Sequence, residues 1–133
     1  MRSKKKVVKN PRVARTRNSA TMTESAFWGM IRAVLRQASR WWKPLAEARK
    51  RAKKYYIGPT SKRKRVAYEC NECKKLFAIT EITVDHIVQA GTLKCAEDLP
   101  GFVTRLFCEV DGLQCLCNDC HDKKTKNERN SEL

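Results

Sequence analysis

Apolar residues recur with helical spacing in two segments of the first half of the chain. The first segment contains Phe27, Met30, Ile31, Val34, Leu35 and Ala38, and the second contains Leu45, Ala48, Ala52, Tyr55 and Tyr56. Intervals of three and four residues bring side chains onto one face of an α-helix. Thr21 and Glu24 match a capping box at the start of the first helix, and Gly58-Pro59 ends the second. The pattern predicts two amphipathic helices within residues 21–58.

The opposite face of the first predicted helix carries Arg32, Arg36 and Arg40. Such a row is either an ordinary solvated face or a set of contacts to nucleic-acid phosphates. The aromatic pairs Trp41-Trp42 and Tyr55-Tyr56 are expected in a core, with stacking on bases as the alternative.

The pattern changes in the second half of the chain. Residues 79–84 alternate between apolar and polar side chains, which predicts a strand, and the polar run from Cys117 to Arg129 is compatible with a helix. Strand and helix flank a long intervening segment, so the second half is expected to differ in structure from the helical first half.

Composition limits the size of any core. Apolar residues make up 41% of the 133 residues, below the roughly 45–50% typical of globular proteins. A compact unit therefore needs an additional cross-link. No run of about 18 apolar residues is present, and the basic N-terminus lacks the apolar stretch of a secretory signal. We expect a cytoplasmic protein without a membrane partner, in which thiols stay reduced.

Positive charge is concentrated in residues 1–65, which hold 21 of the 29 Lys and Arg residues and only two of the 14 acidic residues. Residues 1–20 have no apolar period and are expected to be a disordered basic tail. Residues 21–65 are expected to form a basic helical DNA-binding arm that ends in the hinge Lys62-Arg63-Lys64-Arg65. Nucleic acid is favoured as the partner over an acidic membrane surface or a merely solubilising role.

All seven cysteines lie in the second half, and four of them form two C-x2-C pairs, Cys70 with Cys73 and Cys117 with Cys120. One pair alone could be a redox dithiol, but two pairs favour a structural Zn²⁺ ion bound by four thiolates. The other three are expected to be buried as small apolar residues: Cys95, Cys108 and Cys115. Of these, Cys115 is an alternative to Cys117 as a ligand.

The 43 residues between the two pairs exceed the usual spacing of a simple zinc ribbon, so a further unit is inserted between them. The insertion and the second pair carry two motifs, Val84-Asp85-His86-Ile87 and Leu113-Gln114-Cys115-Leu116-Cys117-Asn118-Asp119-Cys120-His121-Asp122-Lys123-Lys124-Thr125. With the C-x2-C pairs, these motifs resemble the zinc-containing HNH endonucleases common in phages. The resemblance covers about residues 66–127. It implies an α+β fold in which a zinc-held ββα-metal finger, residues 66–133, follows the basic helical arm.

The same resemblance implies a role for each site residue in metal-dependent hydrolysis of DNA, with nicking as the default outcome. His86 is the general base, Asp85 and His121 bind a catalytic Mg²⁺, Mn²⁺ or Ni²⁺ ion, and the paired cysteines bind zinc. A histidine with a pKa of about 6.5 accepts a proton from water near pH 7. An ion held by one carboxylate and one imidazole keeps positions open for water and phosphate. Without the resemblance, the histidines would be interpreted as a satisfied core residue and a spare zinc ligand.

Two positions leave alternatives open. The family usually has an asparagine where this chain has Gly112, so Asp111 or a backbone amide is expected to tie this loop together. Lys123 and Lys124 follow His121 and either hold phosphate or stabilise a helix C-terminus.

The main rival function is a non-catalytic zinc-knuckle nucleic-acid-binding protein, which would need neither Asp85 nor His86. An RNA nuclease or toxin of the same fold is a third hypothesis. Double-stranded DNA is the expected partner, other phage proteins are further candidates, and the compartment is the host cytoplasm if a phage encodes the chain. Sequence specificity and oligomeric state leave no recognisable pattern in the sequence.

Overall fold

A computed structural model describes residues 13–59 and 63–131. Within these ranges the architecture is mixed α+β, as predicted. The helices are α1 (Glu24–Ser39), α2 (Lys43–Ala52), α3 (Leu99–Leu106) and α4 (Asn118–Ser131). The strands are β1 (Arg15–Arg17), β2 (Met22–Thr23), β3 (Lys53–Ile57), β4 (Lys64–Glu69), β5 (Leu76–Phe77), β6 (Ile82–His86) and β7 (Leu113–Cys117). All pairings in the described chain are antiparallel, in the orders β1-β2, β3-β4-β5 and β6-β7.

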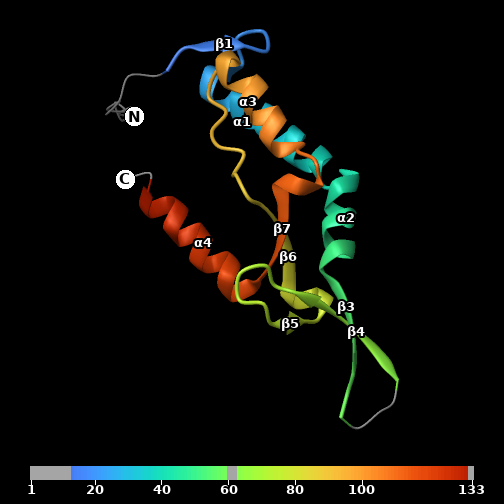
Figure 1. The fold of residues 1–133 in the computed structure, drawn as a ribbon. Helices are drawn as coiled ribbons and strands as arrows, with labels where there is room; N and C mark the ends of the chain where they lie inside the picture. Colours follow the sequence, from blue (N-terminus) through green and yellow to red (C-terminus); the bar gives the residue numbers. More distant parts are fainter. Residues whose placement is uncertain (1–12, 60–62, 132–133) are drawn as a thin grey trace, which may run out of the picture.

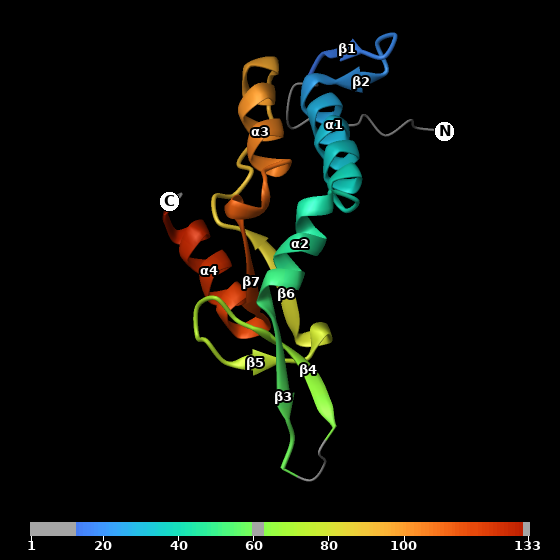
Figure 2. The ribbon, with the colours of Figure 1, turned by 45° about the vertical axis from the view of Figure 1, so that its right-hand side comes forward.

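The molecule is elongated, and its elements follow one another along the long axis (Figures 1 and 2). At one end α1 and α3 lie side by side next to the β1-β2 hairpin. In the middle the β6-β7 ribbon runs between α2 and α4, and both helices contact β7. The β3-β4 hairpin projects from the opposite end.

A cap and a salt bridge define the start of helix α1. Thr23 is the N-cap, and its Oγ1 accepts a hydrogen bond from the amide of Ala26 at 3.1 Å. The capping box predicted at Thr21 is therefore wrong by two residues. Glu24 instead accepts two hydrogen bonds from the Arg17 guanidinium, at 2.8 and 2.9 Å, and one from Trp28. These bonds lower the pKa of Glu24 to about 2.

One hydrophobic core joins α1 to the segment between β6 and β7. Its buried members are Trp28, Ala90, Leu93, Phe102 and Leu106. Trp28 comes from α1, whereas Phe102 and Leu106 come from α3, so the core draws on both halves of the chain. The apolar face of α1 is narrower than predicted, because Met30 and Val34 stay exposed.

A second core surrounds the cysteines of the β6-β7 ribbon. Its buried members are Cys70, Ile82, Cys115, Leu116 and Cys117. In the ribbon Asp85 pairs with Gln114 and Thr83 with Leu116. Because each core is small, a cross-link such as a bound metal ion would add stability that apolar burial alone does not supply.

Helix α2 ends at Ala52, so the prediction of a helix up to Gly58 is wrong. Residues Lys53–Ile57 form β3, which pairs over its whole length with β4. Aromatic and β-branched side chains favour a pleated strand, and an antiparallel partner with the same preference follows in the chain. The expected arm of residues 21–65 therefore ends inside a hairpin, because β4 runs from Lys64 to Glu69.

Two further expectations about the first half need correction. Residues 13–20 include β1 and its turn, so the predicted disordered tail does not extend over them, and residues 1–12 lie outside the described ranges. Trp41 is 85% exposed, and Tyr55 and Tyr56 are exposed too, so these aromatic residues are not in a core. Trp42 does pack inward: its ring meets Phe107 edge-on, and its Nε1 donates to the Cys108 carbonyl at 2.6 Å.

Phe102 should be the side chain on which the first core depends most, because it is fully buried between α1 and α3. We expect Phe102→Ala to lower the free energy of unfolding by about 3–5 kcal/mol. Val88→Ala, at an exposed position before the same core, is the matched control and should change it little. Urea denaturation followed by circular dichroism measures both; equal midpoints for the two variants would contradict this view of the core.

Candidate functional site

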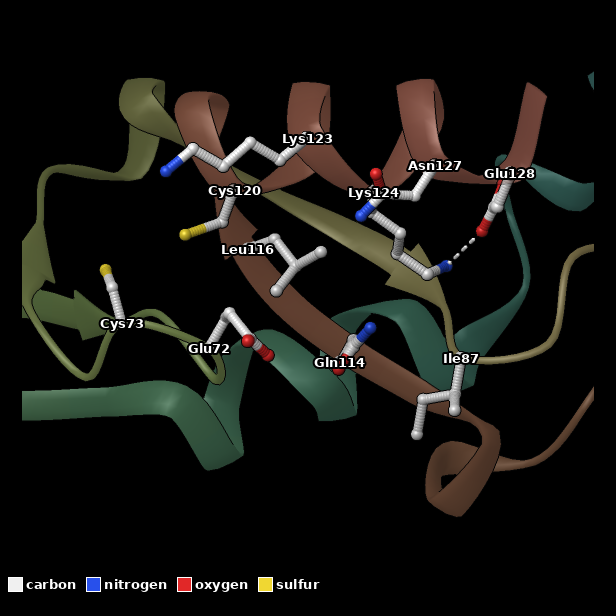
Figure 3. Close-up of a pocket in the computed structure, with 10 residues that line it drawn as sticks. All are labelled: Glu72, Cys73, Ile87, Gln114, Leu116, Cys120, Lys123, Lys124, Asn127 and Glu128. Atoms are coloured by element: carbon white, nitrogen blue, oxygen red, sulfur yellow. Dashed lines mark ion pairs between the residues drawn. The ribbon is translucent and has the colours of Figure 1, made fainter. Parts of the chain in front are cut away.

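The four paired cysteines come together as predicted. Their sulfur atoms all lie within 4.8 Å of one another, and Cys73 Sγ is 3.9 Å from Cys117 Sγ. Four thiolates around Zn²⁺, each about 2.3 Å away, would be about 3.8 Å apart. Figure 3 shows the sulfurs of Cys73 and Cys120 pointing toward each other from the turn before β5 and from the start of α4. The cluster can therefore hold a structural metal such as zinc.

The turn after β4 is shaped to present its cysteines. The Cys70 amide donates to the Lys75 carbonyl at 3.0 Å, the Lys74 amide donates to the Cys70 carbonyl at 3.0 Å, and Lys74 has a positive φ of 63°. Burial opposes ionisation of Cys70, but hydrogen bonds from the amides of Cys117, Cys73 and Glu72 outweigh it and lower its pKa to about 6. A thiolate that forms this readily suits a metal ligand.

Hydrogen bonding inside the cluster acts in the opposite direction on Cys120. Contacts with the Cys117 side chain, burial and the other sulfurs raise the pKa of Cys120 to about 12. Four thiolates at these short distances repel one another strongly, so a bound cation is needed to keep all four deprotonated.

The remaining cysteines lie outside this cluster. Cys115 is buried, and its Sγ donates to the Ala48 carbonyl at 3.6 Å, so it does not replace Cys117 as a ligand. Cys108 is half-buried. Cys95 is exposed, and the prediction that it is buried is wrong.

Asp85 and His121 also come together, at the junction of β6, β7 and α4. Asp85 Oδ1 lies 3.7 Å from His121 Nε2. The other carboxylate oxygen accepts hydrogen bonds from Lys124 Nζ at 2.6 Å and from Gln114 Nε2 at 3.2 Å. Gln114 in turn accepts a hydrogen bond from Asn71, the residue after Cys70, at 2.8 Å. A continuous set of polar contacts thus links the cysteine cluster to Asp85.

Lys124 is held at the centre of this polar group. Its Nζ contacts Asp85, the His86 carbonyl at 2.6 Å and Glu128 at 2.9 Å. Burial works against its charge, but the hydrogen bonds with the two carboxylates outweigh it and raise the pKa of Lys124. A groove of about 800 Å³ lies between α4 and β7, and Lys123, Lys124 and Gln114 line it (Figure 3).

His86 lines a hollow to which Asp85 does not contribute, as expected of successive residues in a strand. Its Nε2 is 2.8 Å from the Leu106 carbonyl, at the end of α3. Because a carbonyl only accepts, Nε2 carries the proton and Nδ1 is the acceptor in the neutral ring. The His86 side chain lines a hollow of about 630 Å³ that is also lined by Arg36 and Arg40 of α1.

Gly112 lies in a tight loop that has no room for a larger side chain. Its carbonyl accepts a hydrogen bond from the Ile87 amide at 2.9 Å, which ties the loop before β7 to the end of β6. A Cβ at this position would lie 2.9 Å from Cys108 Sγ, so an asparagine would collide there. Asp111 does not tie the loop as anticipated, because it is exposed and pairs with Arg51 at 3.0 Å.

The predicted nucleic-acid-binding residues are distributed over three surfaces. Arg32 and Arg36 lie on α1, Arg40 is its C-terminal cap, and Lys123 and Lys124 lie on α4. Lys64 and Arg65 belong to β4 rather than to a hinge, Arg63 precedes them, and Lys62 lies outside the described residues.

The β3-β4 hairpin is a candidate surface that the sequence analysis missed. It exposes Tyr55, Ile57 and Val66 beside the exposed Lys54 and Lys64. The signal for it was present in the sequence: two short runs of aromatic and β-branched residues flank Gly58-Pro59.

No protein-family model, curated protein or solved structure matches this chain. None of the helices in the described ranges is long and apolar enough to cross a membrane.

Loss of one thiolate should remove the metal. We expect Cys73→Ser and Cys120→Ser to lose most of the bound zinc, about one equivalent per chain in the unaltered protein, and to lose cooperative unfolding of the second core. Zinc content by mass spectrometry and thermal unfolding by circular dichroism provide the measurements. Cys95→Ser is the matched control, since Cys95 is exposed and outside the cluster. Full zinc content in Cys73→Ser would count against the four-thiolate site.

Proposed function

We propose that this protein is a metal-dependent endonuclease of the zinc-containing HNH type, which hydrolyses phosphodiester bonds of DNA. The observation that carries the proposal is the 3.7 Å approach of Asp85 Oδ1 and His121 Nε2 where two antiparallel strands and a helix meet. The strand pair β6-β7 followed by α4 has the ββα order implied by the sequence resemblance. The cysteine cluster supports it, because Cys120 fixes the start of the helix one residue before His121.

The donor pair at this junction fits a divalent cation. A carboxylate oxygen and an imidazole nitrogen 3.7 Å apart can each lie about 2.1 Å from one ion. When bound there, such an ion supplies Lewis-acid stabilisation of negative charge on the phosphate. Asp85 is only 15% exposed in its side chain, and Gln114 orients it, so the carboxylate is held ready for this role.

His86 is the residue we assign as the general base. The Leu106 carbonyl holds the proton on Nε2, which leaves Nδ1 free to take a proton from the attacking water. Attack in line with the leaving oxygen then breaks the phosphodiester bond, and the proton passes to His86. One such site cuts one strand at a time, so nicking is the expected product unless the protein dimerises.

A specific observation favours the rival function, a non-catalytic zinc-knuckle protein that binds nucleic acid. The Lys124 ammonium lies 2.6 Å from Asp85 Oδ2 and so compensates the charge that a catalytic cation would otherwise neutralise. In this alternative the Lys124–Asp85 ion pair is a structural element, and the arm and hairpin bind nucleic acid without cleaving it.

Plasmid nicking in the presence of Mg²⁺ or Mn²⁺, with and without a chelator, distinguishes the two functions. We expect His86→Ala to lower the nicking rate by about 10²–10⁴-fold because proton abstraction is lost. Zinc content of the same variant should stay unchanged and serves as its control. Cleavage by His86→Ala at the unaltered rate would show that the base is another group. An RNA substrate run in parallel tests the third hypothesis, a ribonuclease.

Binding to duplex DNA should weaken steeply with salt, because lysines and arginines displace condensed counterions. Contact with about six phosphates gives a slope near −5 in a plot of log affinity against log salt. A variant of the hairpin, Lys54→Gln with Lys64→Gln, should make the slope less steep by about 2. The charge-matched control is Lys75→Gln with Lys94→Gln, two exposed lysines away from the hairpin. Identical slopes for the two variants would exclude the hairpin from the interface.

A further inference from the structure

Two arginines, one on α1 and one at its C-terminal cap, lie beside the proposed general base. Arg36 and Arg40, one helical turn apart, line the hollow of about 630 Å³ that His86 lines from β6. Leu106, whose carbonyl orients His86, lines it from α3. Three elements that are far apart in the sequence therefore meet around one cationic hollow.

These arginines have no acidic partner within the chain that the structure describes. None of the ion pairs found there includes Arg36 or Arg40, and the one acidic residue of α1, Glu24, pairs with Arg17 at the far end of the helix. The guanidinium of Arg36 lies 6.0 Å from the ring centroid of Phe102. Burial and the neighbouring charge of Arg32 lower the pKa of Arg36, which an anion in the hollow would reverse.

The side chains that line the hollow favour a phosphate as its ligand. Guanidinium groups present a planar fork of donors that matches the oxygens of a phosphate. The hollow of about 630 Å³ has room for a phosphate group beside the two arginines. His86 Nδ1 is the ring nitrogen without a partner in the described chain, and it offers an acceptor beside those donors.

We propose that Arg36 and Arg40 form a phosphate subsite for the DNA backbone beside His86, so that α1 and its C-terminal cap supply part of the reaction site. This inference rests on the proposed function, and it changes the role of α1 from a distant DNA-holding arm to a positioning element. The arginines hold a backbone phosphate next to His86, and the base acts on water there.

The chain offers a direct probe, because His86 and His121 are its only histidines. We would follow their ring signals by NMR at constant pH and ionic strength, without added divalent ions, while adding inorganic phosphate or a short DNA duplex. His86 should shift saturably with both, more tightly with the duplex, and His121 should shift less. A response to inorganic phosphate alone would limit the subsite to free phosphate and overturn the DNA assignment.

Variants test the arginines. Arg36→Gln with Arg40→Gln should weaken the apparent affinity reported by His86 at least tenfold, and Arg36→Lys with Arg40→Lys should restore part of it. Lys75→Gln with Lys94→Gln removes the same charge elsewhere and should leave the His86 response intact. Arg40 is exposed after the end of α1, so Arg40→Gln alone keeps the test valid if the double variant unfolds. An unchanged His86 response in the arginine variants would overturn the proposal.

Nicking assays on the same variants separate this inference from the proposed function. If the unaltered protein cleaves, and the arginine variants cleave and bind equally well, the subsite is wrong and the nuclease stands. If no divalent ion supports cleavage while the His86 response still requires the arginines, the nuclease is wrong and the subsite stands.

Discussion

The geometry of the candidate site depends on the close approach of four cysteine sulfur atoms. The cluster fastens the turn after β4 to the end of β7 and the first turn of α4. From there, polar contacts extend through Asn71 and Gln114 to Asp85. Four thiolates this close are stable only with a cation among them. The metal would therefore do more than stabilise a small core, because it also sets the direction in which α4 leaves the ribbon.

Helix α4 carries two residues whose side chains lie next to the Asp85 carboxylate. His121 approaches Oδ1 of Asp85, and Lys124, one turn later, contacts Oδ2. Glu128 lies a further turn along and pairs with the same lysine, which gives the ammonium an alternative partner. This arrangement lets Lys124 retain an ion pair whether or not Asp85 also binds a cation.

Local patterns were enough to predict some of these features. The C-x2-C spacing identified the four clustered cysteines, and apolar periodicity identified α1. His121 directly follows Cys120, so the cluster limits where its side chain lies, and it lies near Asp85. These features depend on residues that are close in the sequence or on a spacing that only one metal geometry explains.

Other features could not be predicted in this way because they depend on tertiary contacts. Tyr55 and Tyr56 fit helical spacing as well as strand preference, and pairing with β4 decides between them. The position of Arg36 next to His86 follows from the packing of α1 on α3, which no local pattern encodes. A side chain at position 112 would collide with Cys108. Trp42 positions Cys108 by donating a hydrogen bond to its carbonyl.

The core shared by α1 and α3 has a consequence for how such a chain can evolve. Phe102 and Leu106 belong to the insertion between β6 and β7, yet they are buried against a helix from the opposite end of the sequence. A recombination event that transferred only the cysteine-bearing half to another gene would uncover these side chains and release the Leu106 carbonyl that orients His86. The two halves therefore depend on each other for this core, although their charges differ.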